Sequence, residues 1–221
     1  MKKLPVLLCI FLLSACAPSE VPSDKLLERN GIQYEINSQI PFTGVSTEYH
    51  ETGQLEFKAT YKDGERQGLY ETYYENGQLK SKETYRDGEE HGLLEAYYEN
   101  GQLWSKGNYK DGERQGLYEK YYENGQLWSK GNYKDKDGES HGLVENYYEN
   151  GQLRSKVTYK DGEQHGLDES YWENGQLWWK RTYKDGWKHG LGETYYENGQ
   201  EASFSPQCYQ NGNQVDMSKC K

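Results

Sequence analysis

The chain has 221 residues and a formal net charge of −10 at pH 7, and only 33% of its residues are hydrophobic. The acidic balance argues against binding to a nucleic-acid backbone and against adhesion to anionic lipid by charge, because both require a basic face. Low hydropathy with high charge is typical of disorder, but disordered chains contain few aromatic residues. Here 14% of the chain is aromatic, which predicts a folded chain held together by aromatic contacts.

Residues 1–15 have the organisation of a secretory signal peptide. A basic start is followed by an apolar run from Leu4 to Leu13, which is too short to span a bilayer, and then by small residues. The sequence LSAC (13–16) resembles the bacterial lipobox, in which the cysteine becomes the acylated first residue. The resemblance implies a lipid on Cys16 that anchors the chain in the cell envelope. Ala17 after this cysteine implies the outer membrane in a Gram-negative host.

Two short segments precede the repeated part of the sequence. Residues 16–29 are polar and rich in Pro and Ser, so we expect a flexible tether. Residues 30–43 begin with the turn signal Asn30-Gly31 and continue with alternating apolar residues. This pattern predicts an N-terminal capping hairpin.

Residues 44–203 form an internal repeat. The spacing is 24 residues, except between the fourth and fifth units, where "KDKDG" (134–138) adds two. Asn-Gly and Asp-Gly pairs recur in the units, such as Asn76-Gly77 and Asp87-Gly88, and these pairs favour tight turns between antiparallel strands. The predicted fold is all-β, an elongated single-layer antiparallel sheet of about seven 24-residue hairpin repeats. The glycines that mark the register are Gly44, Gly68, Gly92, Gly116, Gly142, Gly166 and Gly190.

A two-residue turn at Asn76-Gly77 predicts which side chains lie opposite one another. Glu71 would face Lys82, and this opposite-charge pair recurs along the array and should help to fix its register. Gly68 would face Tyr85, whose ring would cover the bare backbone. The same register places Tyr74 opposite Leu79, and on the other face it pairs Tyr97 with Trp104, Tyr121 with Trp128, and Tyr171 with Trp178.

The C-terminal residues 204–221 depart from the repeat and are expected to form a cap. Cys208 and Cys220 flank the turn signal Asn211-Gly212. An exported compartment permits disulfides, so these two cysteines are predicted to pair and to close the terminal hairpin. The alternative, a metal site, has neither a CxxC pair nor a nearby histidine to support it.

The units, for example "GLYETYYENGQLKSKETYRDGEEH" (68–91), resemble the MORN-variant repeat, and the arrangement from "NSQIPFTG" onward resembles proteins grouped as YwqK-like antitoxins. The resemblance covers residues 40–215. It implies an elongated antiparallel β array, with membrane attachment and protein scaffolding as the roles of MORN arrays. The antitoxin label implies neutralisation of a partner toxin. A cytosolic antitoxin would not carry a lipobox, whereas immunity against a toxin that arrives from outside is compatible with one.

The distance between equivalent residues in successive repeats argues against a metal site or a catalytic carboxylate pair in the array. Four histidines share one repeat position, but successive repeats are about 10 Å apart, whereas zinc ligands must lie about 2 Å from the metal. The glutamates beside the turns are likewise too far apart to act as a carboxylate pair. The mid-strand serines have no histidine in register. No catalytic residue, metal site or cofactor is therefore predicted.

The sequence instead predicts a surface that carries large aromatic rings. Exposed aromatic residues rimmed by charge are typical of protein interfaces. The structural alternative is that the rings pack along their own sheet face. Three functions stay open: a lipid-anchored, non-enzymatic scaffold that binds an unidentified protein, an antitoxin or immunity protein, and a glycan-binding surface. Trp187, where other units place Glu, is the foremost contact candidate. The full set of candidates is Trp104, Trp128, Trp178, Trp179, Trp187, Tyr97, Tyr121 and Tyr171.

Overall fold

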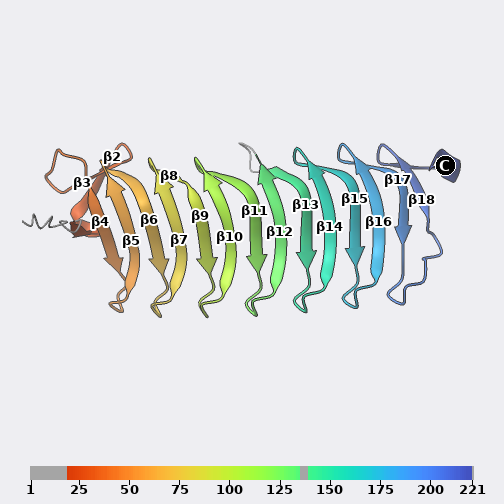
Figure 1. The fold of residues 1–221 in the computed structure, drawn as a ribbon, viewed down its shortest axis with the longest axis horizontal. Coiled ribbons are helices and arrows are strands. Elements are labelled where there is room, and N and C mark those ends of the chain that lie inside the picture. Colours follow the sequence, from red (N-terminus) through yellow and green to blue (C-terminus); the bar gives the residue numbers. More distant parts are fainter. Residues whose placement is uncertain (1–18, 135–138, 221) are drawn as a thin grey trace, which may run out of the picture.

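The computed structural model describes residues 19–134 and 139–220, so the predicted signal peptide and Cys16 lie outside the described residues. One long sheet of 17 strands runs the length of the molecule, and a separate two-stranded sheet lies at its N-terminal end (Figure 1). Neighbouring strands of the long sheet are antiparallel, apart from the parallel pair β1–β4. The predicted all-β array of hairpin repeats is confirmed.

The long sheet contains β1 (Glu20–Pro22) and then β4 to β19 in chain order, and the small sheet contains β2 (Leu26–Arg29) and β3 (Ile32–Glu35). The remaining strands are β4 (Gly44–Tyr49), β5 (Leu55–Lys62), β6 (Glu65–Tyr73), β7 (Leu79–Arg86), β8 (Glu89–Glu90), β9 (Gly92–Tyr97), β10 (Leu103–Lys110), β11 (Glu113–Tyr121), β12 (Leu127–Lys134), β13 (Glu139–Tyr147), β14 (Leu153–Lys160), β15 (Glu163–Tyr171), β16 (Leu177–Lys184), β17 (Trp187–Thr194), β18 (Gln207–Gln210) and β19 (Asn213–Val215). Two 3-10 helices, η1 (Ser23–Lys25) and η2 (Met217–Cys220), complete the described elements.

The N-terminal cap is larger than the sequence predicted. Residues 20–29, expected to belong to a flexible tether, contain β1, η1 and β2. The predicted hairpin turn at Asn30-Gly31 is present, with both residues at positive φ, but its strands begin at Leu26 rather than at residue 30. Hydrogen bonds from Gln33 N to Gly64 O (2.9 Å) and from Gly64 N to Phe42 O (2.7 Å) fix this cap to the first repeat. Phe42, Ala59 and Tyr61 form the buried cluster beneath it.

The two turns of each repeat differ in kind. The Asp-Gly turns are two-residue loops in which both residues have positive φ, as at Asp63 (52°) and Gly64 (85°). In the Asn-Gly turns only the glycine has positive φ, and Tyr74 O accepts a hydrogen bond from Gly77 N (2.8 Å). This is a three-residue loop, a type I turn followed by a left-handed glycine, and it inserts a bulge into the hairpin.

The bulge corrects the predicted register near the Asn-Gly turn. Glu71 faces Lys82 and Gly68 faces Tyr85 as predicted, but the register then shifts by one residue, so that Leu79 faces Tyr73 and not Tyr74. Lys80 is the extra residue on its strand. The same shift recurs in the later repeats.

The register-marking glycines form a second bulge. Tyr61 faces Arg66, but Ala59 faces Tyr70, so β6 carries two extra residues around Gly68. Gly68 has φ 89°, a conformation that side chains other than glycine's adopt only with strain. The predicted covering of these glycines by tyrosine is wrong, because a Cβ at Gly116 would meet no described atom within 4 Å. Ring covering occurs instead at Gly107, where an added Cβ would clash with the ring of Tyr118.

The C-terminal cap closes the sheet. β18 continues the repeat register, with Gly190 facing Tyr209, and a two-residue turn at Asn211-Gly212 leads into β19. The predicted disulfide between Cys208 and Cys220 is present, with a Cα–Cα distance of 5.8 Å. Cys208 is buried, so the bridge ties η2 to the end of the sheet.

Candidate functional site

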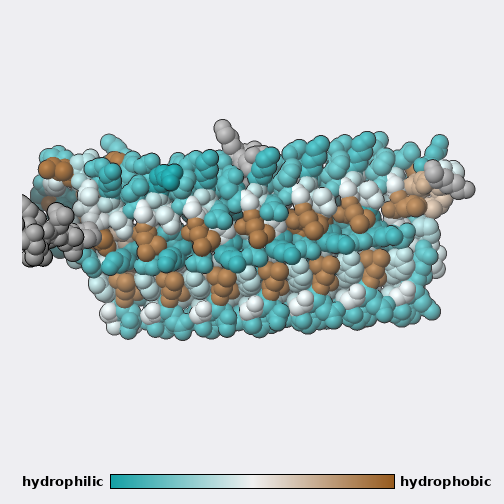
Figure 2. Space-filling model, in the orientation of Figure 1, coloured by the Kyte–Doolittle hydropathy of each residue, from teal (hydrophilic) through white to brown (hydrophobic). Residues whose placement is uncertain are grey.

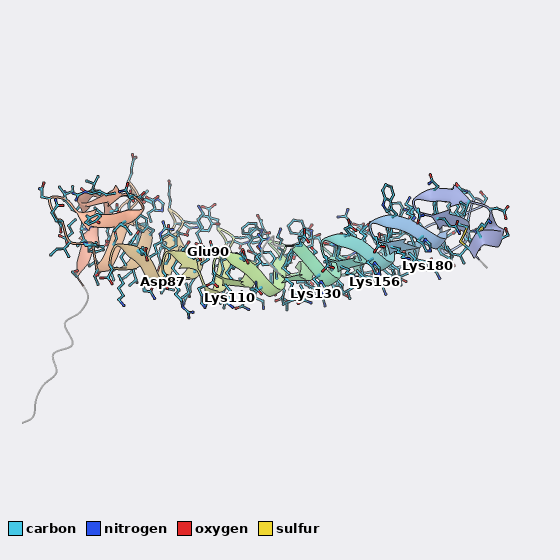
Figure 3. The ribbon with its side chains drawn as sticks, turned by 90° about the horizontal axis from the view of Figure 1, so that it is seen from above. Asp87, Glu90, Lys110, Lys130, Lys156 and Lys180 are labelled. Atoms are coloured by element: carbon cyan, nitrogen blue, oxygen red, sulfur yellow. A yellow bond between two sulfur atoms is a disulfide. The ribbon has the colours of Figure 1, made fainter. Side chains whose placement is uncertain are left out.

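The array has two faces of different composition. Seen from above, it curves along its length, and Lys130, Lys156 and Lys180 lie on the convex side (Figure 3). Because side chains alternate along a strand, the convex face also receives Leu69, Glu71 and Tyr73 and their repeat equivalents. The concave face receives the residues between them. Most of the array's buried side chains lie on that face, namely Ala59, Tyr85, Ala96, Ser105, Tyr118, Asp168 and Ser170.

The convex face repeats one pattern of rows. Figure 2 shows two hydrophobic rows separated by a hydrophilic row. One apolar row consists of leucines that are 38–47% exposed, namely Leu69, Leu93, Leu117, Leu143, Leu167 and Leu191. In the polar row a lysine lies between the glutamate of its own hairpin and that of the next repeat. Four of these lysines form their ion pair with the next repeat, as in Lys130–Glu145 (2.7 Å) and Lys180–Glu193 (2.9 Å). The ion pairs therefore link repeats rather than close hairpins.

Three candidate tyrosines lie along the polar row of the convex face, although Tyr171 also borders the cleft that contains Trp178 and Tyr97 borders the hollow that contains Trp104. Tyr171 donates a hydrogen bond to Glu169 (2.9 Å), and the Nζ atom of Lys106 lies 5.9 Å from the ring centre of Tyr121. Tyr97 occupies the same repeat position. The predicted pairs of these tyrosines with Trp104, Trp128 and Trp178 are wrong, because the three-residue turn moves each tryptophan to the other face.

The tryptophans form a column on the concave face together with two cationic residues. This tryptophan column consists of Lys80, Trp104, Trp128, Arg154 and Trp178, all at the bulge position of successive hairpins. Trp128 packs on Tyr122 with ring centres 5.9 Å apart, and Trp178 packs on Trp172 at 4.9 Å. Arg154 lies 5.7 Å from the ring centre of Tyr148 in the same way. Lys80, Trp128, Arg154 and Trp178 therefore each lie against the aromatic residue that precedes the turn of their own hairpin.

A support row fixes these stacking partners. Its members, Tyr74, Tyr98, Tyr122, Tyr148 and Trp172, each donate a hydrogen bond to a main-chain carbonyl of the next repeat, at 2.7–3.2 Å. The accepting carbonyls belong to Tyr97, Tyr121, Tyr147, Tyr171 and Tyr195. The sequence prediction missed this role, although the signal was present, since every one of these turns is preceded by an aromatic residue that can donate a hydrogen bond.

A cleft of about 480 Å³ lies on the concave face between Trp128 and Trp178. Its floor includes Asn146, Ser155 and Ser170, and Arg154 stands midway between the two tryptophans. Asn146 donates a hydrogen bond to Ser155 Oγ (3.0 Å). Among the described residues that line this cleft, none is a carboxylate. A second hollow of about 330 Å³ includes Trp104.

Trp179 also lies on the concave face, at a position where the second to fifth repeats have serine. The guanidinium of Arg181 stacks on its ring at 4.5 Å. Beside it, Asp168 is 3% exposed, and its Oδ1 atom has no hydrogen-bond partner among the described residues. Burial raises the pKa of Asp168 to about 6, and the nearby charge of Arg181 opposes this rise. This carboxyl is therefore costly to ionise where it lies.

Trp187 lies away from both faces, on the edge formed by the Asp-Gly turns. It is 62% exposed, but its ring packs against the terminal turn, since a Cβ at Gly212 would lie 2.7 Å from Cε3 of the ring. This packing partner belongs to the C-terminal cap, so the repeat pattern could not indicate it. The predicted role of Trp187 in partner binding is untested.

Three of the four histidines that share one repeat position, His91, His141 and His165, lie beside an aspartate of the next turn. His91 Nδ1 is 3.4 Å from Asp111 Oδ1, and His165 Nδ1 is 3.4 Å from Asp185 Oδ1. In the described ranges, no cluster of three or more His, Cys, Asp or Glu side chains could hold a metal ion. No helix within residues 19–134 and 139–220 is long and apolar enough to cross a membrane.

One protein family, described as MORN repeat variant, matches the chain seven times. The matches cover more than half of the sequence, at residues 42–63, 66–87, 90–111, 114–135, 140–161, 164–185 and 188–200. They coincide with the seven hairpin units of the array. No curated protein shows significant similarity to the chain.

Proposed function

The chain belongs to the MORN repeat variant family, whose arrays are repeat scaffolds, and on this premise we propose a function. The protein acts as a non-enzymatic scaffold that is attached to the bacterial envelope by lipid on Cys16. It binds another protein through its concave face. The array provides the surface, and the lipid holds it in place.

The observation that carries this proposal is the tryptophan column with its support row. Tryptophan, tyrosine and arginine are the residues that most often dominate protein interfaces. Here they alternate along a curved array, and such concave surfaces are the ones that repeat proteins use for binding. Because hydrogen bonds fix the support row and Trp128 and Trp178 stack on it, these two rings lose little side-chain freedom when a partner binds.

The proposed anchor rests on the LSAC sequence and on its distance from the fold. Only three residues separate Cys16 from Glu20, the first residue of β1. An extended chain of this length reaches about 14 Å at most. A lipid on Cys16 would therefore keep the N-terminal cap at the membrane surface and leave the array to project from it.

The test combines fractionation with cross-linking in a bacterial host. The full chain should sediment with the envelope, and Cys16→Ser should release it into the soluble fraction. Chemical cross-linking of the wild-type chain should capture a defined protein. A Trp128→Ala/Trp178→Ala variant should lose this protein, whereas Trp187→Ala, which removes a tryptophan outside the concave face, should retain it. Equal capture by the double variant and the wild type would refute the role of the concave face.

The resemblance to YwqK-like antitoxins makes a toxin one candidate for this partner. In that case, co-expression with the captured protein should rescue growth, and the double variant should fail to rescue it. If the captured protein is not toxic, the proposed scaffold function stands and the immunity function is excluded.

A further inference from the structure

We propose that the concave face binds a proline-rich segment of its partner in the polyproline II conformation. This inference rests on the proposed function, because it names the chemistry of the protein that the tryptophan column recognises. The segment would lie along the array and cross the hairpins.

The first argument is the match of two periods. Successive members of the tryptophan column are two strands apart, and strands in a sheet are about 4.8 Å apart, which gives about 9.6 Å per repeat. A polyproline II helix has three residues per turn and rises about 3.1 Å per residue, so every third side chain returns to the same side after about 9.3 Å. On the concave side of a curved sheet, the tips of side chains lie slightly closer together than the backbones do.

Other backbone conformations do not match this period. In an extended strand, side chains on one side recur about every 6.6 Å, and in an α-helix one turn rises about 5.4 Å. Neither value, nor twice either value, equals the repeat of the array. Only the polyproline II segment can present one side chain to every hairpin without changing conformation.

The second argument is the chemistry of the cleft between Trp128 and Trp178. Grooves that bind polyproline II segments are lined by aromatic rings, between which proline rings insert. Proline has no N–H, so such a segment presents carbonyl acceptors and few donors. Asn146, Ser155, Ser170 and Arg154 can donate hydrogen bonds to those carbonyls, and no carboxylate lines the described part of the cleft to compete for donors.

The third argument is the order of residues in the column. Trp104 and Trp128 occupy adjacent repeats, Arg154 the next and Trp178 the one after. A segment that spans these four positions needs about ten residues at three residues per repeat. Prolines would contact the tryptophans, and an acidic residue three positions from a proline would face Arg154.

The binding test uses the purified full chain and synthetic twelve-residue peptides, with tryptophan fluorescence as the signal. The first peptide carries proline at every third position and one glutamate in the same register. The second has the same composition with scrambled spacing, and the third replaces proline by glycine and serine. We expect binding of the first peptide only. Trp128→Ala and Trp178→Ala should each weaken it at least about tenfold, as expected for interface hot spots.

Matched controls separate recognition from folding. Trp187→Ala should bind as the wild type does, and circular dichroism should show that all variants keep the sheet. Arg154→Ala should weaken only peptides that carry the glutamate. Failure of the first peptide to bind the folded wild type, or equal binding of the scrambled peptide, would overturn the inference. So would binding of a chitin tetrasaccharide that Trp128→Ala abolishes while no peptide binds, since that result identifies a glycan surface.

The two proposals can fail separately. If cross-linked capture of a protein depends on Trp128 and Trp178 but no proline-rich peptide binds, the polyproline inference is wrong and the scaffold function stands. If peptide binding is lost in the variants but protein capture is unchanged, the groove binds such segments but does not hold the captured partner.

Discussion

The convex and concave faces of the array are built from the same strands but vary differently along the chain. From the second to the seventh repeat, the convex positions of Leu69, Glu71 and Tyr73 keep leucine, glutamate and tyrosine without exception. The concave position between the first two holds Tyr70, Leu94, Tyr118, Val144, Asp168 and Gly192 in turn. One face is constant and the other differs from hairpin to hairpin.

This difference separates two tasks. The convex rows make the same ion pair between successive repeats from the third to the seventh, so they help to define how units stack in register. The concave positions contain most of the buried side chains and also the tryptophan column, so packing and recognition share this face. A change there should therefore alter stability, binding or both, whereas a change on the convex face should have a small effect.

The largest expected contrast comes from two adjacent residues on opposite faces. Tyr118 is buried over Gly107 on the concave face, and Leu117 is 47% exposed on the convex face. We expect Tyr118→Ala to lower the free energy of unfolding by about 3 kcal/mol or more, because it removes a buried ring. Leu117→Ala should cost less than about 1 kcal/mol. Urea denaturation of both variants measures the contrast, and equal losses would contradict the division between the faces.

A second change should stabilise the concave face. Asp168 holds its proton in the folded chain up to a pH of about 6, but in the unfolded chain only up to about 4. The folded state therefore binds more protons in this window, and its stability should fall as pH rises from about 4 to about 6.

Asp168→Val, which copies Val144 of the preceding repeat, should remove this fall. It should also raise the free energy of unfolding at pH 7 by about 1–3 kcal/mol, because a buried carboxyl with an unsatisfied oxygen is lost. Thermal unfolding of both proteins across this pH range measures the fall in stability and the gain in the variant. An unchanged pH profile would show that Asp168 is not the group that titrates.

A third change isolates the support row. Tyr122→Phe keeps the ring on which Trp128 stacks but removes the hydrogen bond to Tyr147 O (2.8 Å). The expected loss in unfolding free energy is about 1 kcal/mol. The fluorescence of the tryptophans should also become more quenchable as Trp128 gains freedom. Tyr147→Phe serves as the control, since its main-chain carbonyl stays in place.

The smallest effect is expected from a convex ion pair. Lys130 and Glu145 are 2.7 Å apart, but the lysine side chain is 37% exposed. A double-mutant cycle with Lys130→Met and Glu145→Gln should give a coupling of about 0.5 kcal/mol that declines with added salt. A coupling above about 2 kcal/mol would contradict the small contribution expected from the convex face.

Much of this architecture could be predicted from the repeat alone. The 24-residue period, the Glu–Lys register and the pairing of Gly68 with Tyr85 follow from turn chemistry and strand alternation. The terminal disulfide follows from two cysteines around a turn. These features depend on residues that recur or that lie close together in the chain.

The composition of the faces could not be predicted in the same way. Asn-Gly suits both a two-residue and a three-residue loop, and the difference of one residue moves each tryptophan to the opposite face. The predicted site therefore mixed Tyr121, a convex residue, with Trp128, a concave one. The packing of Trp187 on Gly212 joins a repeat to the cap, and no periodic signal reports such a contact.

Both edges of the long sheet end in strands of three residues. Glu20–Pro22 contains a proline, which has no N–H to offer a further strand, and Asn213–Val215 is held by the neighbouring disulfide. Edges this short are poor templates for strand addition, a route by which exposed sheet edges aggregate. The described sheet therefore ends in a short strand on each side. Its length is set by the number of repeats between these two strands. A partner must bind it through side chains, which recur at the spacing of the repeat.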